Sequence, residues 1–196
     1  IYVGKRNGKH SAPQQEINEL LLAKAEEGKL VVRLKGGDPY VFGRGAEEVL
    51  YLKEKGIETE EIPGISSAIA IPAMAGIPVT HRNVSRSFSV ITGHTAPADE
   101  SDVTALHSDI KNSAVMDGTC VYLMGLTHLK EIADTLMQEG KPADTPAAVI
   151  SGGFDGSYRA VYGTLRDIAE KTAKEGIKSP AVIVTGDVVG FQEKLK

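Results

Sequence analysis

The sequence is short of the residues that form cross-links, thiolate metal clusters and membrane spans. It has one cysteine, Cys120, and no tryptophan, and aromatic residues make up 5% of its 196 residues. A single cysteine excludes an internal disulfide and a thiolate cluster. We expect Cys120 to be a buried structural thiol, because it lies in the apolar run 119–123. No apolar run approaches the roughly 20 residues that cross a bilayer, and no signal peptide is visible, so we expect a cytoplasmic protein with no membrane partner.

Excess basic charge is absent as well. The net charge of -4 and the isoelectric point near 5.8 argue against a broad nucleic-acid interface, which needs a basic face. Cationic and anionic side chains nearly balance in residues 1–90, whereas the remainder is acidic. The first half is therefore the better candidate for binding an anionic ligand. With 196 residues the chain is long enough for one large domain or two small ones, and we favour two; 41% hydrophobic residues are typical of a globular protein.

Motifs for nucleotide hydrolysis, nucleophilic catalysis and metal binding are missing. The glycine-rich segment 34–45 has neither the spacing of a phosphate-binding loop nor that of a dinucleotide fingerprint. Ser66, the best candidate nucleophile, has no glycine two residues later. The histidines occur singly and none forms a paired motif with a carboxylate, so we predict no metal site.

Helical and strand patterns alternate along the chain. In the first half we expect helices at residues 13–27, 46–55 and 67–75 and strands at residues 30–34 and 60–62, an order typical of a parallel sheet. In the second half we expect strands at residues 87–92, 119–123, 147–150, 158–163 and 181–185, and helices at residues 103–111, 127–139 and 165–175. The glycine-rich turn 152–156 predicts an antiparallel strand pair, and hence a mixed sheet. The apolar pattern lapses between Pro78 and Arg86, so we place the domains at residues 1–84 and 85–196.

The segment from Leu34 to Gly45 is the most informative part of the chain. It follows an apolar run and carries four glycines, one carboxylate and two cations. Glycines let the backbone approach a ligand closely, and open α/β sheets bind ligands where their strands end. Two roles stay open for Asp38: it accepts hydrogen bonds from a ligand, or it caps N–H groups of its own turn.

Several separated motifs resemble the tetrapyrrole methylase family, in its uroporphyrinogen-III C-methyltransferase branch. They are Val3-Gly4-Lys5-Arg6, residues 34–45 with Glu47-Glu48, Pro63-Gly64-Ile65-Ser66-Ser67, Gly76-Ile77-Pro78-Val79-Thr80-His81-Arg82, Thr92-Gly93-His94 and Leu123-Met124-Gly125-Leu126. The similarity runs from Ile1 to about Val189. The family's first strand, its first glycine loop and an aspartate proposed as catalytic base are expected to precede Ile1.

The resemblance implies an α/β fold with two domains, the first with a mostly parallel sheet and the second with a mixed sheet, and with the active site in the cleft between them. It also implies a homodimer that uses S-adenosyl-L-methionine to methylate uroporphyrinogen III twice, which gives S-adenosyl-L-homocysteine and precorrin-2 on the way to siroheme and cobalamin. The donor site would comprise Gly36, Gly37, Asp38, Val41, Ser66, Ser67, Met124 and Gly153. The substrate would contact Arg44, Glu47 and Arg82, with Lys5 as proton donor.

The chemistry of the substrate agrees with these assignments. Uroporphyrinogen III carries eight carboxylates, which planar guanidinium groups bind in a bidentate fork.

Met124 has two open interpretations, core packing at a strand end or contact with the donor. Two other functions stay open: a methyltransferase of the same superfamily that acts on a later corrin intermediate, rRNA or a translation factor, and an inactive donor-binding fragment. Gly43-Arg44-Gly45 and Thr80-His81-Arg82 favour the uroporphyrinogen branch.

Overall fold

A computed structural model describes residues 1–3, 13–93, 108–153 and 157–195. The chain divides into two compact units, Ile1–Ser66 and Ser67–Lys196. This division lies earlier than the expected boundary between residues 84 and 85, because helix α3 (Ser67–Met74) packs on the sheet of the second unit. Among the described residues, no helix combines the length and the apolar character that a bilayer crossing requires.

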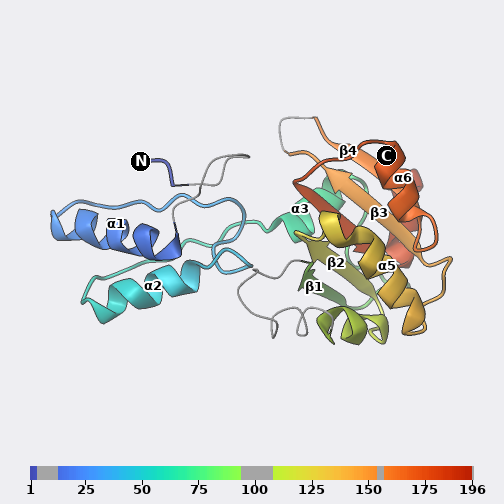
Figure 1. Ribbon diagram of the computed structural model, residues 1–196, viewed down its shortest axis with the longest axis horizontal. Helices are drawn as coiled ribbons and strands as arrows, with labels where there is room; N and C mark the ends of the chain where they lie inside the picture. Colours follow the sequence, from blue (N-terminus) through green and yellow to red (C-terminus); the bar gives the residue numbers. More distant parts are fainter. Residues whose placement is uncertain (4–12, 94–107, 154–156, 196) are drawn as a thin grey trace. The chain divides into compact units, whose positions relative to one another are not determined.

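The first unit contains two helices that pack on each other, α1 (Gln14–Glu26) and α2 (Gly45–Glu54) (Figure 1). Both helices are confirmed close to their predicted bounds. Pro13 precedes α1 with φ -52°, a value that suits the start of a helix. Ile17 and Leu21 are four residues apart, so they lie on one face of α1, and both are buried.

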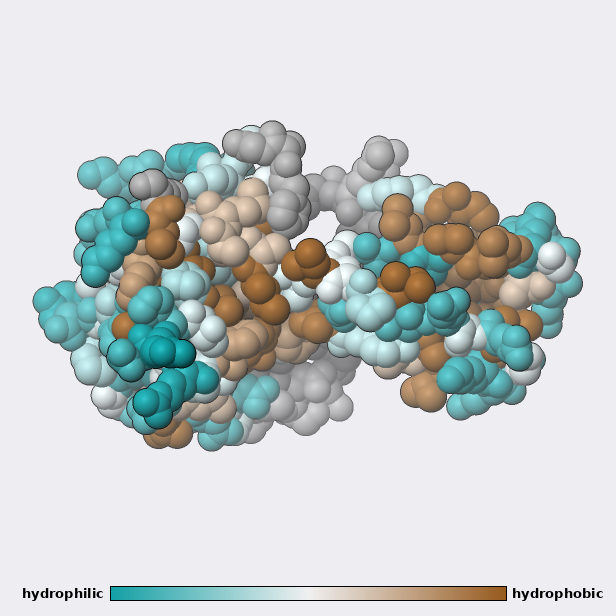
Figure 2. All heavy atoms as spheres, turned by 180° about the vertical axis from the view of Figure 1, so that it is seen from behind, coloured by the Kyte–Doolittle hydropathy of each residue, from teal (hydrophilic) through white to brown (hydrophobic). Residues whose placement is uncertain are grey.

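The strands expected at residues 30–34 and 60–62 do not form among the described residues. The first of these segments still has the two-residue periodicity of a strand. Leu30, Val32 and Leu34 are 95%, 79% and 86% exposed, while the residues between them are partly buried. A strand is defined by pairing of its backbone N–H and C=O groups with a neighbour, and no described segment pairs with this one. The result is an exposed apolar strip (Leu30, Val32 and Leu34), and apolar residues gather on the surface of this unit in Figure 2.

The second unit is built on a five-stranded mixed sheet, as predicted. Its strands are β1 (Phe88–Thr92), β2 (Thr119–Leu123), β3 (Pro146–Ser151), β4 (Arg159–Thr164) and β5 (Ala181–Thr185), in the order β1-β2-β5-β3-β4. β1 and β2 are parallel and the other neighbouring pairs are antiparallel. β5 runs opposite to both β2 and β3, so β1, β2 and β3 all point the same way. Their carboxyl ends therefore lie at one edge of the sheet.

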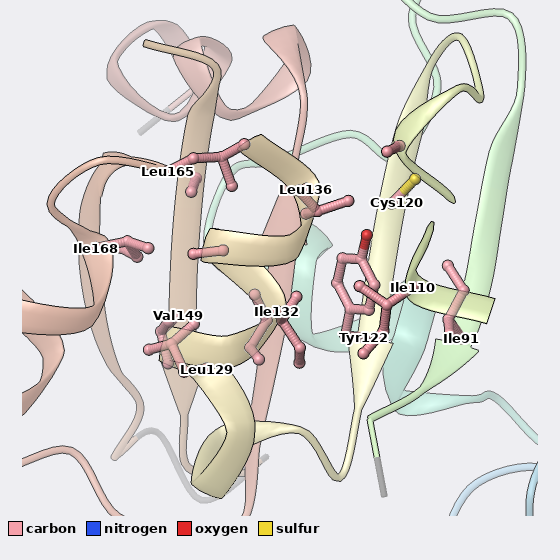
Figure 3. Packing of buried hydrophobic residues seen from close by; sticks show 14 of the residues in the cluster. Ile91, Ile110, Cys120, Tyr122, Leu129, Ile132, Leu136, Val149, Leu165 and Ile168 are labelled. Carbon is pink, nitrogen blue, oxygen red and sulfur yellow. The ribbon is translucent and has the colours of Figure 1, made fainter. Parts of the chain in front are cut away.

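Helices cover both faces of this sheet. Along β2 the side chains alternate, with Cys120 and Tyr122 in one core and Val121 and Leu123 in the other. The first core is covered by α5 (Leu129–Gln138), α6 (Ile168–Lys174) and the helical residues 108–114. The labelled side chains of α5 lie in this core in Figure 3. The second core is covered by α3 and the 3-10 helix η2 (Asp187–Phe191), which the short helix α7 (Gln192–Leu195) follows.

Cys120 is a buried thiol, as predicted. It lies beside the buried Tyr122, whose hydroxyl shares a hydrogen bond of 2.7 Å with Ser113 Oγ. Burial raises the pKa of the Cys120 thiol and that of the Tyr122 hydroxyl above their ordinary values. Both groups are therefore neutral at physiological pH and serve the packing of the core.

Candidate functional site

The glycine loop (residues 36–44) in the first unit is folded tightly on itself before α2 begins. The Gly45 N–H donates to the Pro39 carbonyl at 3.0 Å. A Cβ atom on Gly43 or on Gly45 would lie 2.6 or 2.7 Å from that same oxygen, so larger residues do not fit. Phe42 and Arg44 have φ values of 53° and 57°, which are uncommon for residues other than glycine. Backbone strain of this kind concentrates at ligand-binding sites.

Asp38 joins this loop to the segment around Gly64. Its Oδ1 atom accepts a hydrogen bond from the Tyr40 N–H at 2.9 Å, and its Oδ2 atom accepts one from the Gly64 N–H at 3.1 Å. The two segments also touch through their backbones, because a Cβ on Gly64 would lie 2.1 Å from the Gly37 oxygen. The capping role considered for Asp38 is therefore present. A carboxylate has about four lone-pair sites, so these two bonds leave capacity for a ligand.

Arg44 and Glu47 form a bidentate pair at the end of the loop. Arg44 Nε and Nη2 lie 2.8 and 2.7 Å from the two carboxylate oxygens of Glu47. The hydrogen bonds between them raise the pKa of Arg44 and lower the pKa of Glu47. Both side chains are more than half exposed, and exposed pairs contribute little to stability. The guanidinium fork is therefore accessible to another carboxylate.

Exposed apolar side chains accompany these polar groups. Tyr40, Val41 and Phe42 are consecutive in the glycine loop and all three are exposed. Apolar side chains grouped at the surface are typical of ligand and partner contacts. The contact of Val41 with a ligand stays a prediction.

Two more of the expected residues lie at the edge of the second unit's sheet where β1, β2 and β3 end. Met124 follows β2 with φ 58° and is 50% exposed, so its side chain does not simply fill the core. The strand ends beside it are held close, because the Gly93 N–H donates to the Leu123 carbonyl at 2.7 Å. A Cβ on Gly93 would lie 2.4 Å from Gly125 Cα. Gly153 follows β3, and a Cβ there would meet no atom within 4 Å.

Arg82 lies at the opposite edge of this sheet. Its turn is closed by hydrogen bonds between His81 and Ser85, and Ser85 Oγ lies 2.9 Å from Thr119 Oγ1 where β2 begins. The His81 ring packs on Phe191 at 4.1 Å between centroids. β2 separates this turn from Met124 by roughly 13 Å at the usual rise of a strand. The structure therefore does not bring Arg82 together with Met124 and Gly153.

The remaining expected residues are divided between the units. Gly36, Gly37 and the buried Ser66 belong to the first unit, and Ser67 opens α3 in the second. Lys5 lies outside the described residues. In the part of the chain that the structure describes, no group of three or more His, Cys, Asp or Glu side chains is placed to hold a metal ion.

One buried polar residue of the first unit was not assigned a role from the sequence. Glu48 is 4% exposed and accepts hydrogen bonds from Gln14, Arg33 and Lys35. Glu48 lies in the first turn of α2, close in sequence to the glycine loop, and this position could have indicated from the sequence that it has a role at the loop.

Residues 2–169 match the family of tetrapyrrole (corrin/porphyrin) methylases. The chain belongs to this family. It is 53% identical over 193 residues to a uroporphyrinogen-III C-methyltransferase of Methanocaldococcus jannaschii, with 96% of this chain and 76% of that protein covered. It is 50% identical over 195 residues to an S-adenosyl-L-methionine-dependent uroporphyrinogen III methyltransferase of Methanosarcina barkeri, with 100% of this chain and 75% of that protein covered.

A solved structure supports the same family assignment. The uroporphyrin-III C-methyltransferase of Thermus thermophilus, complexed with S-adenosyl homocysteine, matches with a TM-score of 0.76 and 34% identity, and the match covers 97% of this chain and 77% of that one. The predicted α/β fold of the tetrapyrrole methylases is thereby confirmed.

Proposed function

We propose that this chain transfers methyl groups from S-adenosylmethionine to two ring carbons of uroporphyrinogen III, which gives precorrin-2 on the way to siroheme and cobalamin. The observation that carries the proposal is the identity of half or more of the aligned residues with the two archaeal methyltransferases. The adenosyl compound bound to the Thermus thermophilus relative supports the class of donor.

The glycine loop has the chemistry that an adenosyl donor requires. A Cβ on Gly36 would meet no atom within 4 Å, so space is open beside this backbone. Asp38 retains capacity to accept hydrogen bonds, and Val41 presents an exposed apolar side chain. In the second unit, Met124 and Gly153 are accessible at one sheet edge. We assign the donor contacts to Gly36, Gly37, Asp38, Val41, Ser66, Ser67, Met124 and Gly153.

We assign binding of the substrate carboxylates to Arg44, with Glu47 as its partner in the free protein. A substrate carboxylate would replace the Glu47 carboxylate in the guanidinium fork at small cost, since the pair is exposed. Arg82 is exposed and is assigned the same role, but it lies at the sheet edge away from Met124. Lys5 as proton donor stays a prediction from the resemblance.

S-adenosylmethionine, when bound, would supply the methyl group, and S-adenosylhomocysteine would be the leaving group. The residues of this chain then have to hold the ring carbon in line with that methyl group, and positioning of this kind supplies much of an enzyme's acceleration. The folded glycine loop and the arginine fork suit that task because they fix ligands through several short contacts. A pyrrole ring of a porphyrinogen is already electron-rich and needs little activation.

Incubation of the purified protein with uroporphyrinogen III and S-adenosylmethionine tests the proposal. We expect a product heavier by two methyl groups, detected by mass spectrometry. A product with one added methyl group on a later corrin intermediate, or on RNA, would instead support another activity of the superfamily.

A donor-binding fragment without turnover is the second candidate function. Calorimetry with S-adenosylhomocysteine, combined with the turnover assay, separates the two, because a fragment would bind the compound in calorimetry but leave uroporphyrinogen III unchanged in the assay. We further propose that the protein is a cytoplasmic homodimer, and sedimentation equilibrium of the purified chain measures its oligomeric state.

A further inference from the structure

The buried Glu48 fastens the two ends of the glycine loop to each other. Its Oε1 atom lies 3.0 Å from Lys35 Nζ, and Lys35 is the residue immediately before Gly36. Glu48 itself lies in the first turn of α2, directly after the loop. The ion pair therefore links the residue before the loop to the helix after it, which restricts the glycine-rich segment between them.

Two further donors complete the surroundings of this carboxylate. Arg33 Nη2 lies 3.3 Å and Gln14 Nε2 lies 3.2 Å from the same Oε1 atom. Gln14 also donates to Asn18, a second buried polar residue, at 3.0 Å. α1, the segment before the loop and α2 are thus joined at one oxygen atom.

Burial distinguishes this ion pair from the one between Arg44 and Glu47. The side chains of Lys35 and Glu48 are 11% and 5% exposed, whereas those of Arg44 and Glu47 are more than half exposed. A buried ion pair loses much of its Coulomb energy to desolvation, so it is weak evidence of a gain in stability. Its carboxylate is, however, held by Gln14 and Arg33 as well as by Lys35. This suits a role in fixing the shape of the loop.

We propose that Glu48 is a positioning residue for the donor site: through Lys35 it fixes the conformation of the glycine loop and so sets the affinity for the adenosyl donor, without contacting the donor itself. This inference rests on the proposed function of the loop. Glu48 holds the loop ends at a spacing that leaves the backbone of Gly36 and Gly37 ready to bind. Loss of its charge loosens the loop and raises the entropic cost of binding.

Calorimetry with S-adenosylhomocysteine on the Glu48→Gln variant tests the proposal. The amide keeps the size of the side chain and removes its charge. We expect affinity for the compound to fall on the order of tenfold, and the KM for S-adenosylmethionine to rise by a similar factor, while the KM for uroporphyrinogen III and kcat stay near their wild-type values. Glu54→Gln is the matched control, because Glu54 is an exposed carboxylate on the same helix. The control should bind like the wild type.

A purely structural role would give a different result. In that case Glu48→Gln lowers the melting temperature but leaves the affinity unchanged when it is measured well below that temperature, and the proposal is overturned. The double variant Lys35→Met/Glu48→Gln provides a second criterion. If Glu48 acts through Lys35, the double variant binds S-adenosylhomocysteine as tightly as the single variant with the lower affinity. If the losses of binding free energy in the two single variants add up in the double variant, the mechanism is contradicted.

Two outcomes keep this inference distinct from the proposed function. If Glu48→Gln does not fold, Lys35→Met carries the same binding test, and an unchanged affinity of that variant overturns the role of the pair. If the wild-type protein binds S-adenosylhomocysteine but does not methylate uroporphyrinogen III, the proposed reaction fails, and the binding comparison alone decides the role of Glu48.

Discussion

Asp38 and Gly64 hold two loops of the first unit together. Asp38 Oδ2 accepts a hydrogen bond from the Gly64 N–H at 3.1 Å, although the two residues are 26 positions apart in the sequence. The Gly37 carbonyl lies so close to Gly64 that no side chain fits between them. The shape of the glycine loop therefore depends on a second segment, and both segments must fold before a ligand can bind there.

Gly64→Ala should disrupt this contact. The added Cβ atom would lie 2.1 Å from the Gly37 oxygen, which forces the two backbones apart. We expect a loss of about 2 kcal/mol in the free energy of unfolding, measured by urea denaturation. Gly36→Ala is the control for stability, because its Cβ meets no atom within 4 Å. Equal stability of the two variants would show that the loops are not packed as described.

Arg44→Lys should weaken binding of uroporphyrinogen III. Lysine keeps the positive charge but cannot copy the bidentate fork that Arg44 forms with a carboxylate. We expect the KM for uroporphyrinogen III to rise about tenfold and the affinity for S-adenosylhomocysteine to stay unchanged. Arg166→Lys makes the same replacement at an exposed arginine of the second unit and should have no effect. If donor affinity falls as much as substrate affinity, Arg44 belongs to the donor site.

Asp167 should make a pH-dependent contribution to stability. Its pKa is lowered from the ordinary 3.8 by Lys171, 2.7 Å away, and by the Thr164 N–H at 2.8 Å. A carboxylate whose pKa is lower in the folded state stabilises that state above its unfolded pKa, and this contribution is lost as the pH falls through the folded pKa. Asp167→Asn should therefore cost about 0.5 kcal/mol at pH 7, given its partial exposure, and close to nothing near pH 2. Urea denaturation at the two pH values measures this difference, and Asp144→Asn, at an exposed carboxylate, is the control.

The exposed apolar strip should bind hydrophobic dyes. Leu30, Val32 and Leu34 present their side chains to solvent on one side of a segment that pairs with no other part of the chain that the structure describes, and such patches associate with apolar partners. We expect the combined variant Val32→Thr/Leu34→Lys to bind less anilinonaphthalene sulfonate and to self-associate less, with an unchanged circular dichroism spectrum. Val115→Thr alters an exposed valine of the second unit, outside the strip, and should leave dye binding unchanged. Undiminished dye binding by the combined variant would rule out the strip as the binding surface.

The elements of the second unit were largely predictable from the sequence. β2 and β5 have the predicted bounds, and the antiparallel pair of β3 and β4 follows the predicted glycine-rich turn. β2 and β5 are apolar runs with glycine or proline at their ends, so local sequence carries the information for them. The buried state of Cys120 followed from the same pattern.

Features that depend on distant partners were not predictable. Residues 30–34 have the composition of a strand, but a strand also needs a neighbour to pair with, and none is present among the described residues. Helix α3 is apolar on most sides, so its sequence does not say which unit it packs on. The contacts of Asp38 with Gly64 and of Glu48 with Gln14 bring together residues far apart in the chain. No local signal marks such pairs.

The central claim is that the loop around Gly36 and Gly37 binds an adenosyl sulfonium donor. Its most direct test is a crystal structure of this protein grown with S-adenosylhomocysteine. We predict electron density for the compound against the backbone of Gly36 and Gly37. Density for the compound at another place, with nothing bound at this loop, would contradict the claim.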